Sequence, residues 1–411
     1  MYGNRCFSMA FALALAAAAV SIRPGSNAAA APGTQDEYLR EVASRTARTA
    51  QEMLGRATVA GAGDLTLQVY PAQETWPLFA PVTLFVRLAN AATHSVRGYF
   101  QLNEGSGRLF MYVARSGRDF VPVLSQTALV AQMEDTVFSH GVLPPGGAIT
   151  ARVTLLYDHV TRDYAFPLAG TYRTKAVFAY DLGYKNLVPS DVAEVKVVTP
   201  DPQDAEATGL IEGLEQAKVL QRDSADLGAT ANLRAVVDAC PDSEYALYAR
   251  TPLSWPLGAS YAREAPAADR TLGPRHRAMM EHIIATLGDS KQPAHLRMGA
   301  ALRLGEQFGH KDAIPALVSV INDEPVPMEV RLAALIALSQ IPHESAVERL
   351  IQVMEQHSEA RLRDRARVQL THMGVPSGPA WRRVVKERWV PRSAGNATVI
   401  LDESHETSCV Q

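Results

Sequence analysis

Three nine-residue stretches near the C-terminal end of the chain decide the fold: LRMGAALRL at residues 296–304, VRLAALIAL at 330–338 and LRDRARVQL at 362–370. Their second residues, Arg297, Arg331 and Arg363, lie 34 and then 32 residues apart. Segments that repeat at this spacing are helical hairpins, which bury their apolar faces only by stacking on one another. The sequence therefore predicts a stack of helical repeats over residues 274–374, an architecture that presents surfaces to partners.

A second block repeats at the same spacing, because Ala313-Ile314-Pro315-Ala316-Leu317 matches Ala346-Val347-Glu348-Arg349-Leu350, 33 residues later. Asp312 and Glu344 lie close to the starts of these blocks, where a carboxylate suits the exposed N–H groups of a helix. The pattern resembles HEAT repeats of the phycobilin-lyase type. This resemblance implies three units, about the minimum for a stable stack, and it carries no activity with it. The small residues that allow neighbouring helices to approach are Ala300, Ala301, Ala333, Ala334 and Ala366.

Residues 64–199 have the alternation of β-strands. The run from Val82 to Leu88 is typical, because its apolar side chains at every second position lie on one face. Seven such runs, separated by turns, occur within about 135 residues. This number and spacing predict an antiparallel sandwich.

Four motifs in this region resemble those of exported bacterial immunoglobulin-like domains: Leu88-Ala89-Asn90, Val96-Arg97-Gly98, Leu143-Pro144-Pro145-Gly146 and Ala169-Gly170-Thr171-Tyr172. In that family a Gly-x-Tyr ahead of the penultimate strand forms a structural corner, and the resemblance gives this part to Tyr172. The expected fold class is therefore multidomain, with an all-β immunoglobulin-like sandwich followed by an all-α HEAT-like helical repeat domain.

Local sequence patterns predict the boundaries of the remaining segments of the chain. Residues 33–57 form an N-terminal helix with a linker, and its small apolar stripe suggests mobility. Pro200 and Pro202 end the β region, since two prolines one residue apart resist both strand and helix. The remaining expected segments are a helical hairpin region at 204–260, the repeats at 274–374, a capping helix at 375–390 and a disordered tail at 391–411.

The first 30 residues have the features of a secretory signal peptide. Arg5 precedes a run from Phe7 to Val20 that is apolar apart from Ser8, and small residues follow. The run is shorter than the roughly 20 residues of a membrane span, which favours cleavage over a membrane anchor. We therefore expect an exported protein, periplasmic or secreted. Candidate cleavage sites are Ser26-Asn27-Ala28 and Ala28-Ala29-Ala30.

Charge and cysteine content restrict the possible partners. The 411-residue chain has a net charge of −3, which argues against nucleic acid as a partner.

Cleavage of the signal would leave Cys240 and Cys409, and an exported compartment permits a disulfide between them. One bridge and two free thiols remain equally open, because spacing alone does not bring two cysteines together.

A basic cluster is the strongest candidate for partner binding. Residues 361–392 hold nine basic side chains against two acidic ones. Arginine suits carboxylate and phosphate groups because its fork donates two parallel hydrogen bonds, whereas a solvated outer face of the last repeat is the simpler alternative. We do not expect contact with a membrane surface. The candidate partner contacts in the repeats and the cluster are Arg297, Arg303, Arg331, Arg361, Arg363, Arg365, Arg367, Arg382, Arg383 and Lys386.

The sequence carries none of the common motifs for catalysis, cofactor binding or metal binding. The chain has no His-Glu-x-x-His, no Gly-x-Ser-x-Gly, no Walker loop and no dinucleotide fingerprint. The local cluster of Asp158, His159 and Asp163 could bind a cation or support acid–base chemistry, although a polar surface loop is the simpler account. We therefore predict no catalytic residue, no cofactor and no metal.

These observations predict a non-enzymatic exported scaffold that binds another protein across the helical repeats. The arginines favour an acidic partner. Two alternatives stay open. An enzyme or enzyme subunit of lyase type rests on analogy with the lyases that share the repeat, and the repeats lack a cysteine to hold a tetrapyrrole. A protease inhibitor would act through the loops of the sandwich.

Overall fold

A computed structural model describes residues 32–57, 63–102, 108–125, 141–181, 183–221, 226–253 and 268–373. The expected signal peptide, capping helix and tail lie outside the described residues, as do Arg382, Arg383, Lys386 and Cys409. No helix within the described ranges is long and apolar enough to cross a bilayer.

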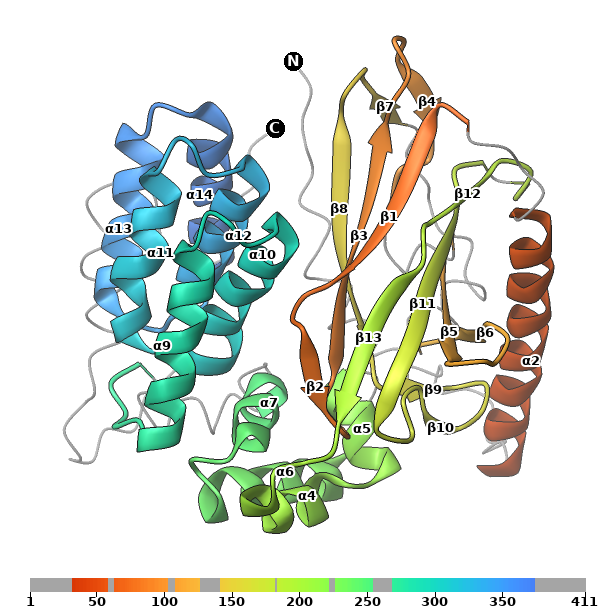
Figure 1. The fold of residues 1–411 in the computed structure, drawn as a ribbon, viewed down its shortest axis with the longest axis horizontal. Coiled ribbons are helices and arrows are strands. Elements are labelled where there is room, and N and C mark those ends of the chain that lie inside the picture. Colours follow the sequence, from red (N-terminus) through yellow and green to blue (C-terminus); the bar gives the residue numbers. More distant parts are fainter. Residues whose placement is uncertain are drawn as a thin grey trace, which may run out of the picture.

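Two sheets make up the β region of residues 65–198 (Figure 1). One sheet has the order β1-β3-β8, formed by Leu65–Pro71, Val82–Asn90 and Ala148–Leu155. The other has the order β2-β13-β11-β5-β6, with strands Thr75–Pro77, Ala193–Val198, Gly170–Ala179, Leu109–Arg115 and Val121–Val123, and β12 (Leu187–Pro189) pairs with β11. All pairs are antiparallel except β13 with β2. Two short ribbons are formed by β4 (Val96–Gly98) with β7 (Gly141–Leu143) and by β9 (Tyr157–Asp158) with β10 (Asp163–Tyr164).

The two sheets share one apolar core. On β3 the alternate residues Val82, Leu84, Val86 and Leu88 are buried in it, as their period-two spacing predicts. Side chains of β5, β11 and β13 enter the same core from the second sheet. A slip of one residue would move each apolar set to the opposite face, so this burial fixes the register.

Tyr172 closes a corner at the start of β11. Its hydroxyl donates to the carbonyl oxygen of Leu168 at 2.7 Å and accepts from the Leu168 N–H at 3.1 Å. The ring is buried and packs edge-on against Phe166. The predicted structural corner is therefore confirmed for this residue.

Helix α2 (Pro32–Ala57) covers the outer face of the second sheet (Figure 1). Its side chains Val42, Ala50 and Met53 are buried against Phe110 and other residues of β5, β11 and β12. The Tyr112 hydroxyl on β5 donates to the carbonyl oxygen of Ala50 at 2.6 Å. The expectation of a mobile helix is therefore corrected, because β5 and β11 are apolar on both faces and give the stripe a partner.

A group of short helices follows the β region at its lower end in Figure 1. These are the turn η2 (Pro202–Asp204) and the helices α4 (Ala205–Ile211), α5 (Leu214–Gln221), α6 (Leu227–Ala239) and α7 (Glu244–Leu253). Their core includes Leu156 and Tyr157 of the β region. Gln221 strengthens this attachment, because its Oε1 accepts the N–H groups of both residues.

The C-terminal helices stack as two layers (Figure 1). One layer contains α9 (Pro274–Gly288), α11 (Ile314–Asn322) and α13 (Glu344–Gln356), and η5 (Lys311–Ala313) precedes α11. The layer on the side of the β region contains α10 (Ala294–Arg303), α12 (Met328–Ser339) and α14 (Ala360–His372). All five alanines that were expected to permit close helix approach are buried. Gly305, in the π-helical turn η4 (Leu304–Phe308), lies directly against the backbone of Ala337.

Asp312 and Glu344 lie in the first turns of their helical segments, as expected, and histidines cap the starts of both segments. The Nδ1 atom of His310 accepts the N–H of Asp312 at 3.2 Å, and Nδ1 of His343 accepts the N–H of Ser345 at 3.1 Å. These residues occupy equivalent places in successive repeats, so their recurrence reflects this capping role and not metal binding.

Candidate functional site

The β region and helix α10 meet in a contact that we call the junction, formed by Tyr70, Ala72, His295, Gly299 and the residues around Glu306. The Tyr70 and His295 rings are stacked with their centroids 4.9 Å apart. At Gly299 the helix approaches so closely that a Cβ atom would overlap the carbonyl oxygen of Ala72. Glycine is therefore required at this position, whereas the equivalent residues of the next two repeats are Ala333 and Arg365.

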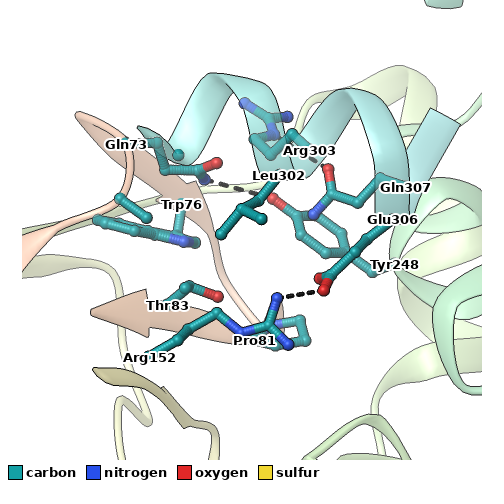
Figure 2. Close-up of a pocket in the computed structure, with 12 residues that line it drawn as sticks. Gln73, Trp76, Pro81, Thr83, Arg152, Tyr248, Leu302, Arg303, Glu306 and Gln307 are labelled. Carbon is teal, nitrogen blue, oxygen red and sulfur yellow. Dashed lines mark hydrogen bonds and ion pairs between the residues drawn. The ribbon is translucent and has the colours of Figure 1, made fainter. Parts of the chain in front are cut away.

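Glu306 makes the main charged contact of the junction (Figure 2). Its carboxylate pairs with the Arg152 guanidinium of β8 and accepts a hydrogen bond of 3.0 Å from the Gln340 side chain, which follows α12. The Thr251 hydroxyl of α7 donates to its backbone carbonyl at 3.4 Å. Three parts of the molecule thus converge on one residue.

Tyr248 on α7 completes the polar contacts. Its hydroxyl accepts from the Gln73 side chain at 3.3 Å and donates to the Glu244 carboxylate at 3.2 Å. Desolvation by burial raises its pKa far above the usual value for tyrosine, so the phenol stays neutral at physiological pH. Arg303 lies nearby and donates to Gln307 at 3.0 Å.

A cavity of about 30 Å³ lies at the junction, which is room for about one or two water molecules. Its lining comes from both parts of the chain and includes Trp76, Thr83 and Arg152 on one side and Tyr248 and Leu302 on the other (Figure 2). A substrate pocket is about ten times larger or more. The junction is therefore suited to holding two parts of the protein together and not to enclosing a substrate.

Two of the predicted partner contacts are buried inside the repeats. Arg297 and Arg331 are each 5% exposed. The Nε of Arg297 donates to the Leu287 carbonyl and the Nε of Arg331 to the Ile321 carbonyl, each at 2.9 Å. Both carbonyls lie in the last turn of the preceding helix, where a cation satisfies free acceptors and the helix dipole. These arginines join the two helices of each repeat, which replaces the expected role in partner binding.

Arg303 and Arg363 also make contacts within the chain. Arg303 lines the junction cavity and lies 3.7 Å from the Glu244 carboxylate. Arg363 donates through Nη1 to the carbonyl oxygens of His357 and Ser358 at 2.6 and 2.7 Å. Both side chains are half-buried, so they too support the packing of helices.

The arginines of α14 that reach solvent are Arg361 and Arg367, while Arg365 is half-buried. Arg367 pairs with Asp364 one turn earlier at 2.9 Å. The half-buried position of Arg365 lowers the pKa of its guanidinium through desolvation. Of the predicted basic cluster, Arg361 and Arg367 are thus exposed on α14, and its role in partner binding stays a prediction.

The layer of α10, α12 and α14 presents equivalent positions toward the β region. Positions 295, 299 and 302 on α10 correspond to 329, 333 and 336 on α12 and to 361, 365 and 368 on α14. On α10 these positions are occupied by the junction. On the other two helices the following side chains are half-buried or exposed, and we call them the inner surface: Glu329, Ile336, Arg361, Arg365 and Val368.

The cluster of Asp158, His159 and Asp163 is a structural loop. Asp158 is buried, and its carboxylate accepts from the N–H groups of Leu124, Val160 and Thr161 and from the Thr161 hydroxyl. Its acceptors are thus occupied by the loop itself. No group of three or more His, Cys, Asp or Glu side chains in the described part of the chain could hold a metal ion.

Cys240 is half-exposed after α6, and burial raises the pKa of its thiol. A raised pKa reduces the thiolate fraction and therefore the reactivity of the residue. Its pairing with Cys409 concerns a residue outside the described ranges and stays a prediction.

Solved structures resemble this chain only weakly. A β-glucosidase from Listeria innocua is 14% identical with a TM-score of 0.20, over 34% of this chain and 17% of that chain. The sporulation control protein Spo0M from Bacillus subtilis is 10% identical with a TM-score of 0.22, over 38% and 57%. The CARDB domain of a Pyrococcus furiosus protein is 13% identical with a TM-score of 0.17, over 33% and 94%. This chain spans about a sixth of the glucosidase, and TM-scores this low carry no argument.

Sequence comparisons identify a family in the C-terminal part only. No curated protein matches the chain. The repeated arginines, the stacked helices and the buried alanines lie within one matched segment, and residues 280–371 match the family of HEAT repeats.

Proposed function

We propose that this protein is a non-enzymatic scaffold that binds a protein partner on the inner surface of α12 and α14. The match of residues 280–371 to HEAT repeats supports this proposal, since such repeats generally mediate contacts between proteins.

The main support for the proposal is that the equivalent face of α10 already contacts the β region. There His295 stacks on Tyr70, and Leu302 faces Trp76 across the junction cavity. The same face continues onto α12 and α14, where Ile336 is half-buried and Val368 is 40% exposed. A face that binds the β region in the first repeat is thus available to a second protein in the next two.

The side chains of the inner surface favour a partner with acidic groups. Arg365 and Arg361 lie about one and two turns before Val368 on α14, against the single carboxylate of Glu329 on α12. Arginine next to an apolar side chain is typical of the residues that dominate binding energy in protein interfaces. A short acidic and apolar segment of a partner matches this chemistry.

Two further features belong to the same proposal. We infer that the β region is immunoglobulin-like, supported by the Tyr172 corner and the shared core of the two sheets. We also infer that the protein is exported, on the basis of its N-terminal sequence.

The experiment is site-specific photo-cross-linking in the cell that produces the protein. A photoreactive phenylalanine analogue replaces Val368 in one variant and Arg349, which is exposed on α13, in the control. We expect a discrete protein adduct at position 368 that is absent at position 349 and is lost on adding R361E. Equal labelling at both positions, or an adduct unaffected by R361E, would contradict the proposal.

A further inference from the structure

His357 lies in the connection between α13 and α14, where its ring also contacts the preceding repeat. Its ring Nδ1 accepts the N–H of Glu359 at 3.0 Å, two residues ahead and immediately before α14. Its carbonyl oxygen accepts from Nη1 of Arg363 at 2.6 Å. The residue is therefore bound to the first turn of α14 by both its side chain and its backbone.

The other edge of the ring reaches the preceding repeat. Nε2 of His357 lies 3.2 Å from Nη2 of Arg331 at the start of α12. Because Nδ1 is an acceptor, the neutral ring carries its hydrogen on Nε2, where the Ile321 carbonyl at the end of α11 is a hydrogen-bond partner. Ile321 also accepts from Nε of Arg331. The neutral imidazole thus connects α11 to α14, while Nη2 of Arg331 and Nε2 of His357 are both donors and form no hydrogen bond with each other.

The charges around the ring disfavour a second proton. Arg331 from α12 and Arg363 from α14 face it, against the single carboxylate of Glu359. Desolvation by burial and the Arg331 charge lower the pKa of His357 below its ordinary value of 6.5. A proton on Nδ1 would point at the Glu359 N–H, remove that hydrogen bond and place a cation at the positive end of α14.

We propose that His357 is a proton-sensitive latch that holds α14 against the preceding repeat when neutral and releases it in acid. The latched form has its full stability above pH 6.5, the ordinary pKa of histidine. Below this pH the stability is lost, because the released form binds a proton more readily than the latched form. Opening of α14 therefore increases as the pH falls below 6.5 and levels off below the folded-state pKa.

The two histidines that cap other helical segments differ in their surroundings. His310 has the Asp312 carboxylate 3.5 Å from its Nδ1, and His343 has the Asp269 carboxylate 4.0 Å from its Nε2. A carboxylate accommodates a charged imidazole. His357 instead faces two arginines, and this distinguishes the latch from the other caps.

Release of α14 would also change the inner surface, since α14 carries Arg361, Arg365 and Val368. This consequence for partner binding rests on the proposed function, whereas the latch itself does not. The test therefore measures conformation of the full chain without a partner, so that failure of one proposal is distinguishable from failure of the other.

The test is hydrogen exchange of the full chain at pH 7.5 and 5.0, with rates corrected for intrinsic exchange. H357N keeps an acceptor for the Glu359 N–H but does not titrate, and H282N changes an exposed histidine on α9 as the control. We expect acid to accelerate exchange in α14 of the native protein and of H282N and to leave H357N unchanged. An equal acid response in H357N, or no response in the native protein, would overturn the latch.

An NMR titration of the native protein keeps the proposal testable if H357N does not fold. We expect the His357 ring to titrate below pH 6.5, together with the amide signals of α14. A ring that titrates at or above 6.5, or independently of those signals, would overturn it.

Discussion

Arg152 on β8 and Glu306 in η4 form an ion pair across 154 residues of sequence, and this pair joins the β region to the helical repeats. Both side chains are largely shielded from solvent, at 28% and 17% exposure. The orientation of the inner surface relative to the β region depends on this contact.

The ion pair predicts energetic coupling between the two regions. In a double-mutant cycle of R152A and E306A, we expect a coupling energy of about 1–2 kcal/mol in urea unfolding, because the charges are partly desolvated. The exposed pair Arg367 and Asp364 provides the control, with coupling below about 0.5 kcal/mol. Equal coupling in both cycles would show that Glu306 contributes no more than a surface charge.

Gly299 predicts a steric requirement in the junction. We expect G299A to destabilise the protein by about 1–3 kcal/mol, because the new methyl group overlaps the Ala72 carbonyl and forces backbone shifts. G288A is the matched control, since a Cβ at the end of α9 meets nothing within 4 Å. Denaturant unfolding measures both variants, and a neutral G299A would show that α10 does not press on the β region.

The arginines of the repeats are expected to divide into two functional groups. R331M should lower the free energy of unfolding by about 1–3 kcal/mol, because it leaves the buried Ile321 carbonyl without this donor. R361M should leave stability within about 0.5 kcal/mol, because its side chain is exposed. Thermal and urea unfolding distinguish the two, and a stable R331M would show that the bond to the Ile321 carbonyl does not stabilise the repeat.

Tyr172 predicts a local contribution to the β region. Y172F removes a hydroxyl that bonds both backbone groups of Leu168, so we expect a loss of about 1–2 kcal/mol. Hydrogen exchange should become faster near β11 and stay unchanged in α9–α14. An identical exchange pattern in Y172F would show that the corner is dispensable.

The burial of His276 predicts that the stability of the protein also depends on pH through this residue. Burial lowers its pKa from 6.5 to about 4, so unfolding is accompanied by proton uptake between these values. Stability is complete above 6.5 and falls by about 3 kcal/mol as the pH decreases to 4. Unfolding free energies measured from pH 7 to 4 check this slope, which H276Q should reduce. A slope unchanged by H276Q would assign it to other groups.

Local periodicity predicted the features that depend on neighbouring residues. The alternation from Val82 to Leu88 follows from the pleat of one strand, and the repeated alanines follow from the helix contacts within one repeat unit. Both kinds of pattern are visible in a single sequence because the residues that make the contact recur at a fixed spacing.

The junction was missed because its partners are distant in sequence and have no common pattern. A signal was nevertheless present, since Gly299 interrupts a position where Ala333 stands in the next repeat. Arg297 and Arg331 recur because each donates a hydrogen bond to a carbonyl of the preceding helix. A charge that recurs in every repeat is as consistent with packing as with a binding surface, and burial decides between them.

The affinity of the cross-linked partner for purified variants tests the central claim most directly. R361E and V368D change the inner surface, whereas R349E makes the same charge change as R361E on α13. The account predicts that the first two weaken binding by at least about tenfold and that R349E stays within about twofold, as expected for interface and non-interface positions. Unchanged affinity in R361E and V368D, with both variants folded, would contradict the assignment of the inner surface as the binding site.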